Sequence, residues 1–295
     1  MARRNARELA DKVAIVTGGA SGIGKALGAE LCARGCEVVL ADRQGDVVEG
    51  VAQGLRDEGN RASAAELDVR DLAAFQHVVA ETRVRAGRVD FLFNNAGIAV
   101  GGEIDRYRPE DWDDVFDVNL RGVAYGVQAA YPVMLEQRSG HIVNTASVAG
   151  LVPSAGEASY TASKHAVVAL TRALRIEARR HGVRASALCP GAIRTPILTG
   201  GRFGRVNLKA RPDQLMTLWE KVRPMDPAVL AERAVDAVLR DEAIIIEPRW
   251  WKAFWYLDRL SPTLSEKLWS AALDRLRADI SRFEAEASGT NGAHP

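Results

Sequence analysis

A tyrosine and a lysine, Tyr160 and Lys164, stand four residues apart near the start of a long helical stretch. Side chains with this spacing lie on the same face of a helix. A free phenol has a pKa of about 10, which is too high for a base at neutral pH. An ammonium group ~4 Å away contributes about 4 kcal/mol at an effective dielectric of ~20, which lowers that pKa by roughly three. The pair therefore predicts a general acid–base tyrosine.

A serine hydroxyl can join this pair. Ser147 follows an expected strand in the segment Asn144-Thr145-Ala146-Ser147, and a short connection leads from it to Tyr160. A tyrosine and a lysine at this spacing are common by chance on a solvated helix. A serine hydroxyl that the chain brings back to face the phenol favours a reaction centre instead. The sequence therefore predicts a site that contains serine, tyrosine and lysine.

Three other polar residues lie near these motifs, and we assign no catalytic role to them. Glu157, three residues before Tyr160, could contact a polar substrate, but we interpret it as a solvated loop residue. His141 and His165 also flank the motifs. We interpret both histidines as structural, because acid–base chemistry at Tyr160 does not require them.

A second motif could hold a pyrophosphate. The segment Thr17-Gly18-Gly19-Ala20-Ser21-Gly22-Ile23-Gly24 follows an expected strand and opens an expected helix. Its glycines permit a tight turn and a close approach of the phosphates to the helix N-terminus. A glycine-rich turn alone is weak evidence, but the strand before it and the helix after it are the context that the motif requires. The segment predicts dinucleotide binding.

An acidic residue is expected to choose the dinucleotide. Asp42 ends the second expected strand, about twenty residues after the glycines, and Arg43 follows it. A carboxylate there accepts both ribose hydroxyls of NAD and repels the 2′-phosphate of NADP. Arg43 could hold that phosphate, but it offsets only part of a repulsion worth a few kcal/mol at ~4 Å. We expect NAD as the cofactor and keep NADP as the alternative.

These motifs require a scaffold in which strands and helices alternate. The expected strands are Val13–Thr17, Glu37–Ala41, Ala62–Leu67, Phe91–Phe93, His141–Thr145, Arg184–Leu188 and Ala243–Glu247. The expected helices are Lys25–Arg34, Val47–Glu58, Leu72–Ala86, Glu110–Gln137, Tyr160–Arg180 and 228–240, the last with Asp226 as N-cap and Pro227 as first residue. The pattern predicts a Rossmann-type, doubly wound α/β fold, with a parallel sheet of about seven strands and helices on both faces.

In combination, the motifs resemble the short-chain dehydrogenase/reductase family, in its main single-domain branch, over about residues 10–247. TGxxxGxG stands at 17–24 and YxxxK at 160–164. Further matches are the NNAG segment at 94–97, the Asp68-Val69 pair of the adenine site, Asn119 in Val118-Asn119-Leu120, and Pro190-Gly191 with Thr195.

The resemblance implies a role for each matched residue. Tyr160 exchanges a proton with the substrate oxygen, and Ser147 hydrogen-bonds that oxygen. Lys164 binds the nicotinamide ribose, and Asn119 holds a water that links Lys164 to solvent. The implied cofactor-binding residues are Gly18, Ser21, Gly22, Ile23, Gly24, Asp42, Arg43, Asp68, Val69, Asn95, Ala96, Gly97, Tyr160, Lys164, Pro190, Gly191, Ile193 and Thr195.

Charge and cysteine content restrict the class of protein. The net charge of +1 provides no global field that would recruit nucleic acid. The cysteines Cys32, Cys36 and Cys189 form no CxxC pair, so we expect a reducing compartment and no metal site. No secretory leader is expected at the basic N-terminus, and no run approaches the ~20 apolar residues of a membrane span. These features predict a cytoplasmic protein.

Residues 194–225 are expected to form a long irregular segment that acts as a substrate lid on the domain 1–247. Its basic residues could close on an acidic substrate, although a solvated flap explains them as well; they are Arg194, Arg202, Arg205, Lys209, Arg211, Lys221 and Arg223. Leu215, Met216, Leu218 and Trp219 suggest that an apolar helix covers the pocket. The apolar helix favours a bulky, mainly apolar substrate.

Residues 248–287 are expected to form an aromatic-rich helical tail, and 288–295 to be disordered. Seven large apolar residues lie between Trp250 and Leu260, and Trp269, Leu273, Leu276, Ile280 and Phe283 recur at helical spacing beyond Pro262. Residues 248–269 could contact a membrane surface peripherally, because aromatic and basic residues alternate there. Packing over the substrate pocket or a neighbouring subunit is preferred, because the apolar arc is wide and Asp258 interrupts it. A tail that forms a pocket entrance at the membrane surface is a third alternative.

The combined prediction is an NAD(H)-dependent oxidoreductase that interconverts an alcohol and a ketone or aldehyde on an apolar small molecule. Two alternatives stay open: an NADP-linked reductase of acyl thioesters or carbonyl xenobiotics, and a non-catalytic dinucleotide-sensing or scaffold protein. The family commonly pairs through the helices found here at 111–137 and 160–180, so a homodimer or homotetramer is expected. Small residues that would permit close helix approach are Ala124, Ala129, Ala130, Ala166, Ala169 and Ala173.

Overall fold

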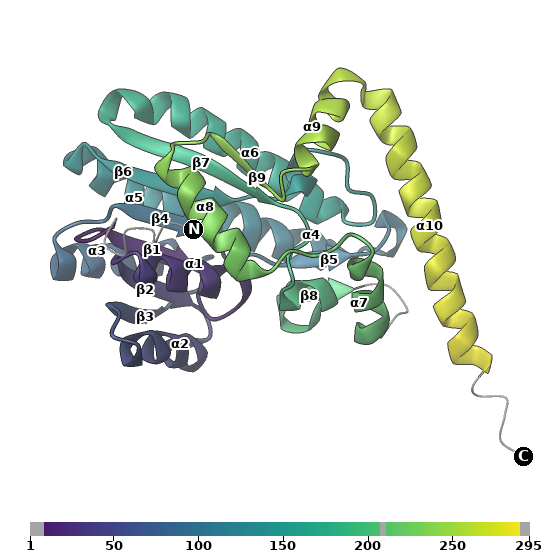
Figure 1. Ribbon diagram of the computed structural model, residues 1–295, viewed down its shortest axis with the longest axis horizontal. Coiled ribbons are helices and arrows are strands. Elements are labelled where there is room, and N and C mark those ends of the chain that lie inside the picture. The colour runs from purple at the N-terminus through teal and green to yellow at the C-terminus, as the bar shows by residue number, and fades with distance from the viewer. Residues whose placement is uncertain (1–8, 207–210, 290–295) are drawn as a thin grey trace, which may run out of the picture.

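The computed structural model describes residues 9–206 and 211–289. Within them, seven parallel strands form one sheet in the order β3-β2-β1-β4-β6-β7-β9 (Figure 1). The strands are β1 Val13–Thr17, β2 Glu37–Asp42, β3 Ala62–Glu66, β4 Phe91–Asn94, β6 Gly140–Thr145, β7 Val183–Pro190 and β9 Ile244–Glu247. This topology confirms the predicted doubly wound parallel sheet.

Two layers of helices cover the sheet because alternate residues of each strand point to opposite faces. On β1, Ala14 and Val16 pack in a core with α1, α2 and α8, whereas Ile15 packs in a core with α3, α5 and α6. The helices are α1 Gly22–Ala33, α2 Gly45–Asp57, α3 Leu72–Ala86, α5 Gly122–Gln137, α6 Ala158–Ala178 and α8 Pro227–Leu239. The strands are apolar at nearly every position because both faces are buried.

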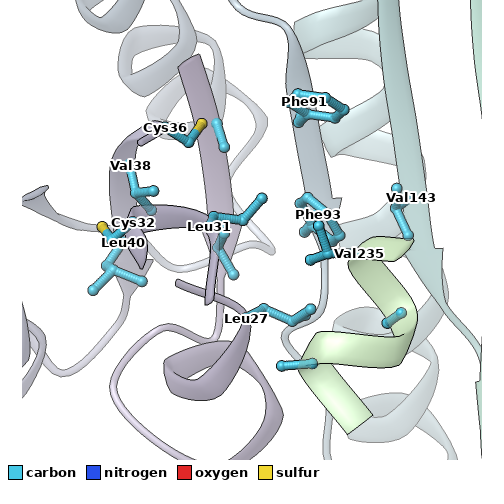
Figure 2. Packing of buried hydrophobic residues seen from close by; sticks show 14 of the residues in the cluster. Leu27, Leu31, Cys32, Cys36, Val38, Leu40, Phe91, Phe93, Val143 and Val235 are labelled. Carbon is cyan, nitrogen blue, oxygen red and sulfur yellow. The ribbon is translucent and has the colours of Figure 1, made fainter. Parts of the chain in front are cut away.

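Figure 2 shows the first of these cores. Leu27 and Leu31 of α1 face Phe93 of β4 and Val235 of α8. Cys32 lies in the same cluster as a small, buried, free thiol. The start of α8 agrees with the prediction, since Asp226 accepts hydrogen bonds from the backbone N–H groups of Ala228 and Val229 at 2.7 and 3.4 Å.

The helix predicted at 110–137 is present as one continuous helical stretch, but it is not a regular α-helix throughout. The structure has α4 Pro109–Phe116, a π-helical turn at Asp117–Arg121, and then α5. The side chain of Asn119, within the wider turn, exchanges two 2.9 Å hydrogen bonds with the backbone N–H and C=O of Ile98. Such bulges are frequent at functional sites, and this one lies beside the predicted reaction centre.

The segment 194–225 is more regular than expected. It contains short turns at Pro196–Thr199 and Gly201–Phe203, strand β8 Gly204–Val206 and helix α7 Pro212–Glu220. Strand β8 pairs with β5 Ala99–Gly101, which holds this segment next to the end of β4. Lys209 lies outside the described residues.

Several of its basic side chains are paired within the protein. Arg205 forms ion pairs with buried Asp111 and with Asp114, and Arg194 pairs with Glu220. Lys221 pairs with Asp279 of the tail. These ion pairs engage basic side chains that, in the lid interpretation, would bind an acidic substrate.

The tail forms two helices, α9 Trp251–Leu260 and α10 Pro262–Gly289, at the right-hand edge of Figure 1. Helix α10 continues through Ser288 and Gly289, where disorder was expected, and residues 290–295 lie outside the described residues. Among the described residues, no helix is both long and apolar enough to cross a membrane.

Candidate active site

A cavity of about 470 Å³ opens at the carboxyl ends of the strands. The glycine-rich turn, the ends of β2, β4, β6 and β7, and the first turn of α6 form one side of it. The segment 195–222 and the tail helices form the other side. Ligands of open parallel sheets bind at this edge, where the direction of winding reverses.

The glycine-rich turn is folded so tightly that side chains cannot be added. Gly18 and Gly22 have φ angles of +70° and +53°, which favour glycine. A Cβ on Gly24 would lie 2.1 Å from the carbonyl oxygen of Gly18. The hydroxyl oxygen of Thr17 accepts hydrogen bonds from the N–H groups of Asn95 and Ala96, at 2.9 and 3.0 Å. Thr17, which sequence reasoning did not select, thus ties the turn to the NNAG segment.

The carboxylate of Asp42 is held at the end of β2. Its Oδ2 accepts from the N–H of Ala20 at 3.2 Å, and its Oδ1 accepts from the N–H of Gln44 at 3.0 Å. The side chain borders the cavity next to Arg43. Asp68 also borders the cavity, and its carboxylate is bonded to the guanidinium of Arg70.

Nearly all the predicted cofactor residues line this one cavity. They are Gly18, Ser21, Gly22, Ile23, Asp42, Arg43, Asp68, Val69, Asn95, Ala96, Gly97, Tyr160, Lys164, Pro190, Gly191, Ile193 and Thr195. Gly24 does not line it, because it is buried under the turn against Gly18. The fold therefore gathers segments that are up to about 180 residues apart in sequence.

Ser147, Tyr160 and Lys164 meet at the middle of the cavity wall. Ser147 hydrogen-bonds the Tyr160 side chain, and its Oγ also lies 3.4 Å from the carbonyl oxygen of Pro190. The Lys164 Nζ lies 5.5 Å from the centre of the Tyr160 ring and donates to the carbonyl oxygen of Thr145 at 2.8 Å.

The electrostatics of the tyrosine differ from the prediction. Burial raises the pKa of Tyr160 above its ordinary value, and the Glu157 carboxylate adds to that effect, while Ser147 opposes it. Burial lowers the pKa of Lys164 to about 8. The predicted lowering of the Tyr160 pKa by Lys164 is therefore wrong for the protein alone, because desolvation dominates and the ammonium is directed at a backbone carbonyl.

Asn119 lies behind the cavity rather than on its surface. It is fully buried, and its Nδ2 donates to the Ser163 Oγ at 3.2 Å. A Cβ on Gly97 would lie 3.2 Å from the Asn119 Oδ1 and 3.5 Å from the Lys164 Nζ, so both groups surround this glycine. Asn119 thus lies close to Lys164 without bordering the cavity.

The histidines lie away from the reaction centre. His141 is buried and lies 2.8 Å from the Ser186 Oγ, and burial lowers the pKa of its imidazole to about 3. The His165 Nδ1 lies 3.0 Å from the carbonyl oxygen of Thr161 on an exposed helix face.

The interpretation of Glu157 as a solvated residue is wrong. Its side chain lines the cavity, and burial raises its pKa to about 7, which a hydrogen bond from Ser154 partly opposes. A position in a loop at the surface of a chain usually indicates solvation. Here the loop forms one cavity with the segment 195–222 and the tail, which local sequence does not reveal.

The remaining wall of the cavity is apolar and comes largely from distant segments. Leu215, Leu218 and Trp219 of α7 line it as predicted, whereas Met216 does not. Other apolar residues of this wall are Leu198, Phe203, Val206, Val222, Trp251, Trp269 and Leu276. The last three belong to the tail, in agreement with the preferred interpretation that the tail packs over the substrate pocket.

The tail is fastened over the site by aromatic and ionic contacts. A Cβ on Gly191 would lie 2.2 Å from the Trp251 Nε1, so the indole rests directly on this glycine. Trp251 and Trp269 stack at 6.4 Å with an interplanar angle of 6°. Arg277 of α10 forms an ion pair with Glu103, in the loop after β5.

Comparison with known proteins agrees with this architecture. Residues 12–202 match the family model described as short chain dehydrogenase. The oxidoreductase UcpA of Salmonella typhimurium is 35% identical over 232 residues, which cover 77% of this chain and 87% of that protein.

Solved structures give the same result. A short chain dehydrogenase/reductase from Burkholderia phymatum, solved in complex with NAD, is 32% identical, with a TM-score of 0.77 over 87% of this chain and 96% of that one. Levodione reductase is 31% identical, with a TM-score of 0.73 over 81% of this chain and 97% of that one. With a family model that spans more than half of the sequence and relatives of this similarity, the chain belongs to the short-chain dehydrogenase/reductase family of oxidoreductases.

Proposed function

We propose that this protein is an NAD(H)-dependent dehydrogenase or reductase that interconverts an alcohol and a ketone or aldehyde on a bulky, mainly apolar substrate. The observation that carries the proposal is the single cavity in which the glycine-rich turn, the Ser147–Tyr160–Lys164 group and an apolar wall meet. Each part is common alone, but together they provide a cofactor site, an acid–base group and a substrate pocket.

The residues of the cavity fit a nicotinamide dinucleotide. A Cβ at Gly24 would collide with the turn, and α1 begins where a pyrophosphate would meet its N-terminal N–H groups. Asp42 lies at the end of β2 with its carboxylate oriented by backbone N–H groups, as a ribose acceptor requires. The NAD-bound relative from Burkholderia phymatum is consistent with this assignment.

NAD is preferred to NADP for an electrostatic reason. The Asp42 carboxylate would repel a 2′-phosphate, and two backbone N–H groups hold it in place. Arg43 borders the same cavity and keeps the NADP-linked reductase as the second candidate.

The chemistry of this chain would be acid–base chemistry at one substrate oxygen. The nicotinamide group supplies hydride transfer when bound. Tyr160 exchanges the proton with the substrate oxygen, and Ser147 Oγ donates a hydrogen bond to it. Lys164 holds the ribose, and Asn119 holds a water that connects the buried ammonium to solvent.

The raised pKa of Tyr160 has a consequence for the direction of proton transfer. Burial keeps the phenol protonated in the protein alone, which suits the donation of a proton during ketone reduction. For alcohol oxidation the phenol must ionise, so the positive charge of the oxidised nicotinamide has to add to that of Lys164.

The apolar wall favours a bulky substrate. Segment 194–225 and tail helices α9 and α10 contribute most of that wall, so we propose that both act as the substrate cover of the domain 1–247. The ion pairs of Arg194, Arg205 and Lys221 with other residues argue against a site for an acidic substrate such as an acyl-CoA.

A substrate screen tests the proposal. Secondary and primary alcohols of increasing apolar bulk are supplied with NAD⁺ or NADP⁺, and the matching ketones with NADH or NADPH, while nicotinamide absorbance is followed. We expect turnover that grows with apolar bulk and prefers NAD(H). Binding of NADH without turnover of any alcohol or carbonyl compound would instead favour a dinucleotide-sensing protein.

A further inference from the structure

A carboxylate without a cationic partner lies inside the apolar cavity. Glu157 is the residue before α6, and the side chain lines the cavity three positions before Tyr160. Within the described residues, Ser154 provides the one hydrogen bond found for its carboxylate, which forms no ion pair there. A carboxylate removed from water costs free energy unless partners compensate it. Glu157 is half-buried at the cavity wall, so this cost grows when a bound molecule displaces the water beside it.

The backbone holds Glu157 in place from two directions. The N–H of Gly102 donates to the carbonyl oxygen of Gly156 at 2.7 Å, and Gly102 and Glu157 form a β-bridge. The N–H of Thr161 donates to the carbonyl oxygen of Glu157 at 2.8 Å, which starts the helix that carries Tyr160. The carboxylate therefore belongs to the same rigid unit as the reacting phenol.

The cations near the cavity are directed elsewhere. Lys164 donates to the carbonyl oxygen of Thr145, and Arg205 pairs with Asp111 and Asp114. The Glu157 charge raises the pKa of both Tyr160 and Tyr107, so its field reaches the reaction centre. A hydrogen-bond donor on a bound molecule would satisfy this carboxylate where the protein does not.

We propose that Glu157 determines substrate specificity by accepting a hydrogen bond from a second donor group of the substrate, next to the reacting carbon. The favoured substrates are then apolar molecules that carry a vicinal diol, hydroxyketone or amino alcohol at one end. This inference rests on the proposed function, since Ser147 and Tyr160 are assigned to the first oxygen. Discrimination follows because a bound mono-alcohol would exclude water from this half-buried carboxylate without offering it a hydrogen bond.

The test compares substrates that differ in one donor group. The vicinal diol, the vicinal amino alcohol and the mono-alcohol of one phenylethyl skeleton are oxidised by the wild type, Glu157→Gln and Glu157→Leu. We expect the wild type to prefer the diol to the mono-alcohol by at least ~10-fold in kcat/KM. In Glu157→Leu this ratio should fall to about 1, and in Glu157→Gln to an intermediate value, because an amide oxygen still accepts.

The required measurement is the ratio of kcat/KM for the diol to kcat/KM for the mono-alcohol. Removal of the Glu157 charge also changes the pKa of Tyr160, but that change affects both substrates and cancels in the ratio. The amino alcohol separates the two kinds of donor: if the natural group is an ammonium, Glu157→Gln should reduce the preference for the amino alcohol more than that for the diol.

Asp105→Asn is the matched control, because Asp105 is an exposed carboxylate that does not line the cavity. It should leave the diol preference within about twofold of wild type. An equal diol preference in wild type and both Glu157 variants, or an equal change in Asp105→Asn, overturns the inference. If Glu157→Leu does not fold, the diol preference of the nearly isosteric Glu157→Gln variant tests the inference.

Failure of the proposed function gives a different result from failure of this inference. If no alcohol or ketone is turned over, the dehydrogenase assignment fails, and the inference is judged by ligand-observed NMR on the full chain with NADH. Stronger binding of the diol than of the mono-alcohol, lost in Glu157→Leu, would then support it. Equal binding of the two compounds would overturn it.

Discussion

At the scale of single residues, burial shifts the pKa values of the two ionisable groups of the site in opposite directions. Removal from water disfavours charge, so burial raises the pKa of the Tyr160 phenol and lowers that of the Lys164 ammonium to about 8. The phenol is therefore not set for base catalysis by the protein alone. The cationic nicotinamide of the oxidised cofactor would therefore contribute to the ionisation of the phenol.

Replacement of the phenol tests its assignment as the acid–base group. Tyr160→Phe removes the hydroxyl and keeps the ring, so kcat should fall by ~100-fold or more. NADH affinity, measured by fluorescence titration, should change by less than about threefold, because Lys164 remains to hold the ribose. Tyr256→Phe, at an exposed position of the tail, is the control. Near-normal turnover of Tyr160→Phe would refute the role.

Replacement of Asp42 tests the choice of cofactor. The wild type should prefer NAD to NADP by at least ~10-fold in kcat/KM, which is about 1.4 kcal/mol. Asp42→Ala removes the repulsion of a 2′-phosphate and leaves Arg43, so the gap should narrow chiefly through better use of NADP. Parallel steady-state assays with both cofactors measure this. A wild type that prefers NADP would contradict the interpretation of Asp42.

At the scale of elements, tail helices α9 and α10 have one face on the cavity and another exposed. Trp251, Trp269 and Leu276 line the cavity, and the predicted stripe at 269, 273, 276, 280 and 283 is half-buried throughout. Elsewhere the tail exposes large apolar side chains, which are Trp250, Phe254, Tyr256, Leu260, Leu264 and Leu268. Packing on the body accounts for the first face, and peripheral membrane contact stays a prediction for the second.

A pair of substitutions separates these two faces. Trp269→Ala shortens the cavity wall and loses about 1–2 kcal/mol of apolar contact, so the KM of bulky substrates should rise by roughly 5–30-fold. Leu260→Ser, at a side chain that is 85% exposed, should leave KM unchanged. If the exposed face binds membranes, Leu260→Ser should instead reduce co-sedimentation with liposomes. A normal KM in Trp269→Ala would contradict a role of the tail in the pocket.

At the scale of the whole molecule, helices α5 and α6 are the surfaces through which we propose that two copies pair. The structure corrects the list of small residues at that surface, since Ala129 and Ala130 are buried within the chain. Ala169 and Ala173 are exposed on α6. Ile176 on the same helix is 79% exposed and borders a surface hollow together with Tyr131 and Leu135 of α5, so apolar side chains of both helices meet on this surface.

Ile176→Asp should therefore weaken the dimer. A charge buried in an interface without a partner costs several kcal/mol, so the variant should be largely monomeric at micromolar concentration by light scattering. Val229→Asp is the control, because Val229 is 37% exposed on α8, in the helix layer on the other face of the sheet. A monomeric wild type, or a dimer unaffected by Ile176→Asp, would exclude this surface.

The sequence by itself determined the order of the strands and helices along the chain and the chemistry of the motifs. Strand β1 is predictable because its residues are apolar on both faces, and the glycine-rich turn because only glycine permits its φ angles and close contacts. These are local constraints. The pairing of Tyr160 with Lys164 likewise follows from helical periodicity alone.

Only the tertiary structure decided what surrounds those motifs. Glu157 changes from an expected solvated residue to a half-buried carboxylate of the cavity wall, because segments 40–120 residues further along the chain complete that cavity. For the same reason the Tyr160 pKa rises instead of falling, and Trp251 rests on Gly191. Burial and dielectric depend on contacts between distant parts of the chain, so local sequence patterns do not determine them.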